Sequence, residues 1–243
     1  MSRGFEITRE VDLPASPEDI WTAITADSAA WQFPTGMEIP AGATPPAGAP
    51  IQTWDPPRRL VIRIESPDGT FNALDYAIEA RGGGTAHLRY VHSGILADDW
   101  ADQYDAVSAH TDFYLHTLGQ YLEHFNGRRV TYVGQPPAGI EGPKAAAAAD
   151  AMDTLRAALG IGSEAAVGDE VHADLGEAGP IDGVIDYLTP EFVGVRTQDS
   201  LFRFFGRNHF GSVVGMSAHV FRDDVDASAA AEALASWLDS VYA

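Results

Sequence analysis

The chain has 243 residues, enough for one large domain or two small ones, and its 45% of hydrophobic residues supply a core in either case. Its 35 acidic residues outnumber its 15 basic residues, and the net charge of −20 argues against binding to nucleic acid or to an anionic membrane. The absence of cysteine excludes disulfides, thiolate catalysis and cysteine-ligated metal sites.

The chain opens with the pattern of a strand followed by short helices. Apolar and polar residues alternate over 5–13, which predicts a half-buried strand with Arg9 on its apolar side. Ser16 and Pro17 then predict the start of a helix, because serine caps a helix amino terminus and proline fits its first turn. A second short helix is expected around 28–31.

A long loop and a run of strands follow. Prolines and glycines fill residues 34–50, which predicts an irregular segment. Alternating runs at 60–64, 74–78 and 88–92, separated by turn residues, predict an antiparallel meander. Apolar residues spaced three or four apart from 100 to 122 then predict a long helix that lies on the sheet.

The second half has its own helices and strands. Proline and glycine are frequent in residues 129–143, which we interpret as a linker, and the alanine-rich run 144–159 predicts a helix. The chain is expected to end in a helix. Strands are expected at 168–175, 181–188, 192–198, 201–205 and 213–221. The predicted class is therefore α+β, with one domain over 1–128 and a smaller one over 144–243.

Short segments in the two halves resemble each other. Residues 55–63 align with 188–196, and Val91-His92 aligns with Ala218-His219. Each half also closes with a predicted helix. Two interpretations stay open: the smaller α+β half is a degenerate, truncated repeat of the first, or it is a family-specific tail that packs against the first domain.

Several of these segments together resemble a known family. They are the opening strand with Pro17-Glu18-Asp19-Ile20-Trp21, the run from Trp54 to Leu60, Val91-His92-Ser93-Gly94, and the long closing helix. They resemble the SRPBCC (START-like) superfamily, in the branch related to the carboxy-terminal domain of the activator of heat shock protein 90 ATPase. The resemblance covers residues 1–128 well. It implies a helix-grip fold, in which a curved antiparallel sheet wraps the long helix around a cavity for an apolar small molecule.

The side chains expected to line this cavity are aromatic or histidine. They are Tyr76, Tyr90, His92, Trp100, Tyr104 and Tyr114, with Trp31, Phe33 and Trp54 near the mouth. Aromatic residues with polar tips suit an apolar ligand that carries one or two polar groups, although the same spacing is also typical of an ordinary core. His92 either orients a ligand, acts as a general base, or is a hydrogen-bonded core residue. Arg9 pairs either with an anionic ligand or with an internal carboxylate, and we favour the carboxylate.

The sequence contains no specific catalytic or metal-binding motif. His110 and His116 lie six residues apart, a turn of about 600° that separates them around a helix. The Gly82-Gly83-Gly84 run lacks the lysine of a phosphate loop, and the glycines after residue 159 follow a predicted helix where a dinucleotide fingerprint needs a strand. We therefore expect no catalytic residue, no metal ligand and no cofactor.

These observations favour a non-enzymatic binding or regulatory protein with a cavity for an apolar or aromatic small molecule. One alternative is a chaperone-assisting protein with a protein partner, and another is an enzyme similar to the polyketide cyclases and aromatases of the same superfamily. Neither a nucleic-acid partner nor a membrane partner is expected. With no long apolar run and no signal-peptide pattern in the sequence, we expect a cytoplasmic protein.

Overall fold

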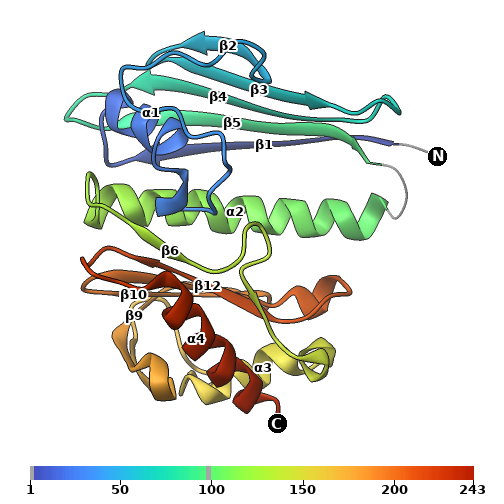
Figure 1. Cartoon of the computed structure of the whole chain (residues 1–243), viewed down its shortest axis with the longest axis vertical. Coiled ribbons are helices and arrows are strands. Elements are labelled where there is room, and N and C mark those ends of the chain that lie inside the picture. Colours follow the sequence, from blue (N-terminus) through green and yellow to red (C-terminus); the bar gives the residue numbers. More distant parts are fainter. Residues whose placement is uncertain (1–2, 97–99) are drawn as a thin grey trace. The chain divides into compact units, whose positions relative to one another are not determined.

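The structure, a computed structural model, describes residues 3–96 and 100–243. The chain divides into two compact units: the first comprises Met1–Gln32 and Gly36–Gly127, and the second comprises Phe33–Thr35 and Arg128–Ala243. Each unit contains an antiparallel sheet and helices (Figure 1). The predicted α+β class is confirmed.

The first unit follows the predicted order, with one strand that the sequence did not reveal. Its elements are β1 (Arg3–Leu13), α1 (Pro17–Thr25), the 3-10 helix η1 (Ser28–Ala30), β2 (Ile51–Asp55), β3 (Arg59–Glu65), β4 (Phe71–Ala80), β5 (Ala86–Leu96) and α2 (Trp100–His124). The unpredicted strand is β2, a short edge strand whose partner among the described strands is β3. The sheet order is β1-β5-β4-β3-β2, so the first and last strands are neighbours.

Local capping explains where α1 begins. The Ser16 hydroxyl accepts a hydrogen bond from the backbone N–H of Asp19, and the Asp19 carboxylate accepts one from the backbone N–H of Ser16. This reciprocal capping box satisfies N–H groups that have no partner inside the helix. The Ser16 hydroxyl also donates to the Asp19 carboxylate at 2.6 Å, and this hydrogen bond, with smaller contributions from Asn126 and the Ser16 backbone, lowers the pKa of Asp19.

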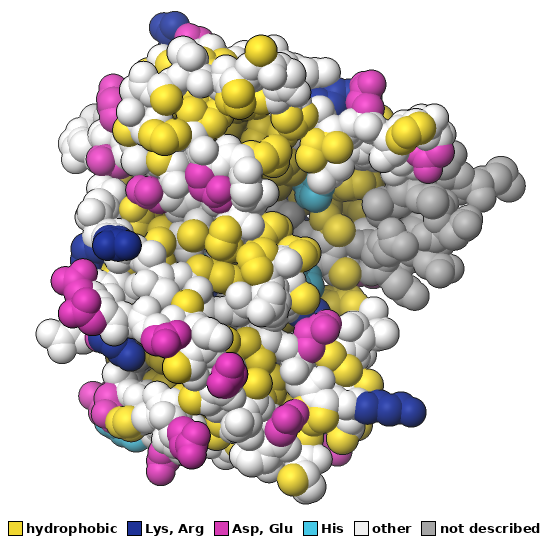
Figure 2. Space-filling model, viewed as in Figure 1, with side chains coloured by type: hydrophobic (Ala, Val, Ile, Leu, Met, Phe, Trp, Pro, Cys, Tyr) yellow, Lys and Arg dark blue, Asp and Glu magenta, His cyan; other side chains and the backbone are white. Residues whose placement is uncertain are grey.

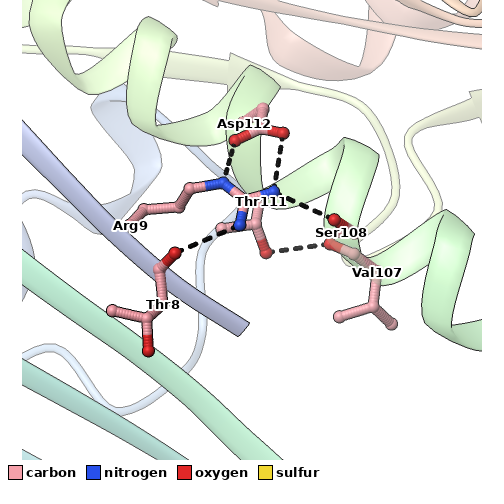
Figure 3. A network of polar contacts seen from close by, with 6 residues as sticks. All are labelled: Thr8, Arg9, Val107, Ser108, Thr111 and Asp112. Carbon is pink, nitrogen blue, oxygen red and sulfur yellow. Dashed lines mark hydrogen bonds and ion pairs between the residues drawn. The ribbon is translucent and has the colours of Figure 1, made fainter. Parts of the chain in front are cut away.

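An ion pair attaches α2 to the first strand (Figure 3). The Arg9 guanidinium donates from both Nε and Nη2 to the Asp112 carboxylate, and Nη2 also donates to Ser108 Oγ at 3.0 Å. Its Nη1 donates to the backbone carbonyl of Thr8 at 3.1 Å. Arg9 therefore pairs with an internal carboxylate, as favoured from the sequence, and it holds one face of α2 against β1.

The second unit has a similar strand order. Its elements are β6 (Thr131–Val133), β7 (Ile140–Glu141), η2 (Lys144–Ala147), α3 (Ala151–Ala158), β8 (Glu170–Asp174), η3 (Gly176–Ala178), β9 (Pro180–Leu188), β10 (Phe192–Thr197), β11 (Ser200–Phe205), η4 (Arg207–Phe210), β12 (Gly215–Val220) and α4 (Ala227–Val241). The sheet order is β6-β12-β11-β10-β9-β8, and β7 also pairs with β12. As in the first unit, the first strand lies beside the last, and a helix follows the last strand.

Two sequence-based predictions for the second unit are wrong. The expected linker 129–143 contains β6 and β7, whose backbone groups pair with β12, so it belongs to the second sheet. The expected helix over 144–159 is interrupted after η2, because Ala148 has an extended backbone. The Asn208 amide donates to the carbonyls of Ala148 and Ala149, and the N–H of Val214 donates to the carbonyl of Ala146. These tertiary hydrogen bonds replace those of a continuous helix.

The segments that resemble each other in sequence occupy equivalent places in the two sheets. Residues 55–63 lead into β3 and 188–196 into β10, and each of these strands is fourth in its sheet when counted from the unit's first strand. The pairs Val91-His92 and Ala218-His219 lie on β5 and β12, which are each second.

Candidate functional site

Three of the predicted residues gather on one face of the first sheet. Tyr76 on β4 and Tyr90 on β5 are cross-strand partners whose ring centroids are 5.0 Å apart, and they are 3% and 8% exposed. His92 follows on the same face of β5, with its ring centroid 6.4 Å from that of Tyr90. We call Tyr76, Tyr90 and His92 the strand-face cluster.

The pairing register of β1 and β5 shows which face of the first sheet carries the strand-face cluster. Arg9 is the cross-strand partner of Tyr90 on the other side of β5, and directly paired residues present their side chains on the same face. Because Arg9 binds Asp112 of α2, the strand-face cluster lies on the face that α2 covers. Leu60 and Trp54 continue the same row onto β3 and β2.

A glycine makes room for the packing around His92. A Cβ atom on Gly94 would lie 2.6 Å from the carbonyl oxygen of Phe71 and 2.7 Å from Cε1 of Phe5, closer than real Cβ contacts. With glycine at this position the Phe5 ring fits, and it meets the His92 ring edge-on at a centroid distance of 5.0 Å. The Val91-His92-Ser93-Gly94 segment thus has a packing role in addition to carrying the histidine.

Burial keeps the strand-face cluster uncharged near neutral pH. It lowers the pKa of His92 to about 4, so the imidazole is neutral. Its Nε2–H donates to Oδ1 of Asn72 at 2.6 Å, which leaves Nδ1 as a hydrogen-bond acceptor. Burial also raises the pKa of Tyr76, and burial and then the neighbouring Tyr76 raise the pKa of Tyr90, so both phenols stay protonated donors.

The two phenol groups have unused hydrogen-bonding capacity. Within the part of the chain that the structure describes, neither the Tyr76 nor the Tyr90 hydroxyl has a hydrogen-bond partner. The strand-face cluster therefore presents two donors and, on His92, one acceptor within an otherwise apolar surface.

The remaining residues predicted near the mouth lie in different surroundings. Trp31 is buried and its indole N–H donates to the carbonyl of Ala23 at 2.9 Å, which is a core position below α1. Trp54 is half-buried and contacts Trp21 of α1 edge-on at 4.8 Å. Phe33 belongs to the second of the two compact units.

The predicted residues on α2 do not share one face. Tyr104 is half-buried and lies eight residues before Asp112, about 80° from it around the helix axis. Tyr114 lies two residues after Asp112, about 200° from it, and its ring is 6.2 Å from that of His110. Tyr114 is therefore on a different face of α2 from the one bound to β1. The side chain of Trp100 lies outside the described part of the structure.

Sequence reasoning did not identify the hollows that the tertiary structure forms. One, of about 340 Å³, lies between β1 and α2 and is lined by Arg9, Leu13, Asp112 and His116 among others. Another, of about 560 Å³, lies in the second unit between its sheet and α4. No single motif marks either hollow, because the lining residues come from distant segments.

Among the described residues, no group of three or more histidine and carboxylate side chains is placed to hold a metal ion. Within the same residues, none of the helices combines the length and the apolar character needed to cross a bilayer.

Comparisons with known proteins place the chain beside several solved structures. No protein-family model and no curated protein matches the chain. A protein from Mesorhizobium loti is 18% identical, with a TM-score of 0.40, over 50% of this chain and 99% of that one. An AHSA1-like protein from Rhizobium etli is 21% identical, with a TM-score of 0.36, over 52% and 91%. DynU16, a protein in the dynemicin biosynthetic locus, is 14% identical, with a TM-score of 0.38, over 98% and 95%.

Proposed function

We propose that each unit is a helix-grip domain and that the second is a repeat of the first. In both units the first strand lies beside the last strand, and the last strand is followed by a helix. The Arg9–Asp112 ion pair, which holds α2 on the sheet, supports this architecture for the first unit. The α4 residues Leu234, Trp237 and Leu238 share the core of the second unit with its strands, which supports it there.

We further propose that the first unit is a non-enzymatic binding protein for an apolar, hydroxylated aromatic small molecule. The observation that carries this proposal is that Tyr76 and Tyr90 are buried residues whose hydroxyls have no hydrogen-bond partner among the described residues and so remain available to a ligand. A ligand carbonyl or hydroxyl can accept hydrogen bonds from these two phenols, and a ligand hydroxyl can donate to Nδ1 of His92. Figure 2 shows hydrophobic side chains within a recess of the first unit, a setting that suits an apolar ligand body.

The protonation state of His92 favours binding over acid–base chemistry. A general base is most effective when its pKa lies near the working pH. Burial lowers the pKa of His92 to about 4, so at neutral pH the imidazole is a weak base that accepts hydrogen bonds without taking up the proton. The strand-face cluster therefore orients a ligand through hydrogen bonds.

The experiment that tests this role separates binding from folding. Tyr76→Phe removes only a hydroxyl, and that hydroxyl has no hydrogen-bond partner among the described residues, so the ligand-free variant should be at least as stable as wild type. The same variant should bind the flavonoid naringenin about tenfold more weakly by isothermal titration calorimetry, since one charge-neutral hydrogen bond disappears.

Tyr121→Phe is the matched control. The Tyr121 hydroxyl donates to the Asp27 carboxylate at 3.2 Å, so its removal should lower stability and leave naringenin affinity unchanged. The proposal fails if wild type binds neither naringenin nor hydroxyanthraquinones, or if Tyr76→Phe and Tyr121→Phe change affinity equally. A stability loss in Tyr76→Phe would show that the hydroxyl has a partner in the ligand-free protein.

A further inference from the structure

The second unit contains a cavity of its own between its sheet and α4. Its volume is about 560 Å³, within the range of small-molecule sites. Its floor is apolar: Phe202 comes from β11, Ala218 and Val220 come from β12, and Ala230 and Leu234 come from α4. A ligand with an apolar body would therefore find contacts on two sides, from the strands and from the helix.

The mouth of this cavity is acidic. Its carboxylates come from strand β9 and from three connecting segments: Asp182 lies on β9, Glu177 precedes that strand, Asp199 lies between β10 and β11, and Asp224 and Asp226 lie between β12 and α4. We call these five residues the acidic mouth. Among the described lining residues the only basic one is Arg222, and its guanidinium lies 3.6 Å from the Asp199 carboxylate. Four carboxylates are thus left without a guanidinium from the cavity wall.

Some carboxylates of the acidic mouth form hydrogen bonds within the protein, and others do not. Asp226 caps α4 by accepting from the N–H groups of Ser228 and Ala229. Asp182 accepts from the exposed His172 ring at 2.8 Å. Glu177 and Asp224 have no side-chain partner among the described residues, so their charge is available to a ligand.

The chemistry of the cavity selects one class of ligand. A simple metal ion does not fit, because the described carboxylates form no group of metal-binding geometry. An anionic ligand would be repelled by the acidic mouth. We propose that this cavity binds an amphiphilic organic amine, with its apolar body against Phe202 and Leu234 and its ammonium group at the acidic mouth. This site is separate from the strand-face cluster and does not depend on it.

The test uses two fluorescent probes that share a ring system and differ in the charge at the end of the tether. Dansylcadaverine carries an ammonium group, and dansyl-6-aminohexanoate carries a carboxylate. Transfer of the dansyl ring into an apolar cavity increases its emission and shifts it to the blue. Wild type should bind dansylcadaverine at least tenfold more tightly than the carboxylate probe, and added salt should reduce that difference.

Two variants locate the site. Glu177→Gln combined with Asp224→Asn should weaken dansylcadaverine binding about fivefold, because two exposed charges at the mouth are removed. Asparagine suits position 224, where φ is +60°. Ala230→Trp should abolish binding by filling the cavity. The control, Glu232→Gln with Asp239→Asn, removes the same charge from exposed positions of α4 outside the lining.

Each possible result of the probe experiments either supports or overturns the proposed amine site. The proposal is supported if the cation is preferred and both cavity variants weaken binding while the control does not. It is overturned if neither probe binds, if both probes bind equally, if the anion is preferred, or if the control variant has the same effect as the mouth variant. Because Tyr76→Phe lies in the other unit, it should leave dansylcadaverine affinity unchanged, so this test and that of the first-unit site fail independently.

Discussion

Replacing His92 with glutamine should remove a specific pH dependence of stability. Burial lowers the pKa of His92 from 6.5 to about 4, so in the window between these values the unfolded chain binds a proton that the folded chain does not. Stability of the wild type therefore falls as the pH drops from 6.5 toward 4. Glutamine retains an amide donor for Asn72 and does not titrate.

The size of the change in unfolding free energy follows from the pKa shift of His92. A full shift of this size corresponds to about 3 kcal/mol, and between pH 7.5 and pH 5 about 2 kcal/mol of it is lost. The stability of His92→Gln relative to wild type should rise by that amount over the same interval. Other titrating groups are common to both proteins and cancel in the difference.

Equilibrium urea unfolding at several pH values measures this difference. Tryptophan fluorescence is a suitable signal for the first unit, because four of the five tryptophans lie before residue 128. His172→Gln is the control of opposite sign: the hydrogen bonds that the His172 ring donates to Asp182 and then to Glu170 raise the pKa of His172, so its contribution is present at low pH and lost as the pH rises. A pH-independent difference between wild type and His92→Gln would refute the burial of a neutral imidazole.

Two further substitutions probe the packing of each unit. In the second unit, Gly194→Ala should cost about 3 kcal/mol in unfolding free energy, because the new Cβ would meet Oδ1 of Asp186 at 2.1 Å and disturb its buried ion pair; calorimetric unfolding checks this. In the first unit, Arg9→Met should cost about 1 kcal/mol in urea unfolding, because its ion pair with Asp112 is partly exposed at 32% and 44%.

Each of these has a matched control. Gly162→Ala places a Cβ where no heavy atom lies within 4 Å, so it should leave the unfolding temperature nearly unchanged. Arg58→Met removes an exposed ion pair with Asp55, whose loss should be too small to measure. Equal losses in Gly194→Ala and Gly162→Ala would contradict the steric argument, and equal losses in the two arginine variants would contradict the anchoring of α2.

Local patterns determined much of the fold. Alternation over 5–13 and the apolar stripe of 100–122 identified β1 and α2, because one buried face imposes a period of two on a strand and of about 3.6 on a helix. Ser16 and Pro17 located the start of α1 through capping, which depends only on neighbouring residues. The strand at Ile51–Asp55 was not predicted, because it is a short edge strand in which apolar and polar residues hardly alternate.

The sequence predicted the candidate sites less completely than it predicted the fold. His92 stood out because it continued an apolar face, but its partner Asn72 and the edge-on Phe5 come from other strands, and only the register reveals them. Tyr114 followed the same helical stripe, yet a position 200° from Asp112 puts it on another face. His219 aligns with His92 in the sequence. Of the neighbouring residues Ala218 and His219, however, it is Ala218 that lines the cavity beside α4.

The sequence by itself therefore determined the class, the order of most elements and the face on which Tyr76, Tyr90 and His92 lie, because these depend on interactions over a few residues. The tertiary structure alone decided the rest. It interrupted the alanine-rich helix with hydrogen bonds from Asn208 and Val214, and it recruited 129–143 into a sheet. It also brought acidic residues from distant segments to one cavity mouth. Such long-range pairings leave no periodic trace in the chain, since each partner is chosen by the packing of the whole unit.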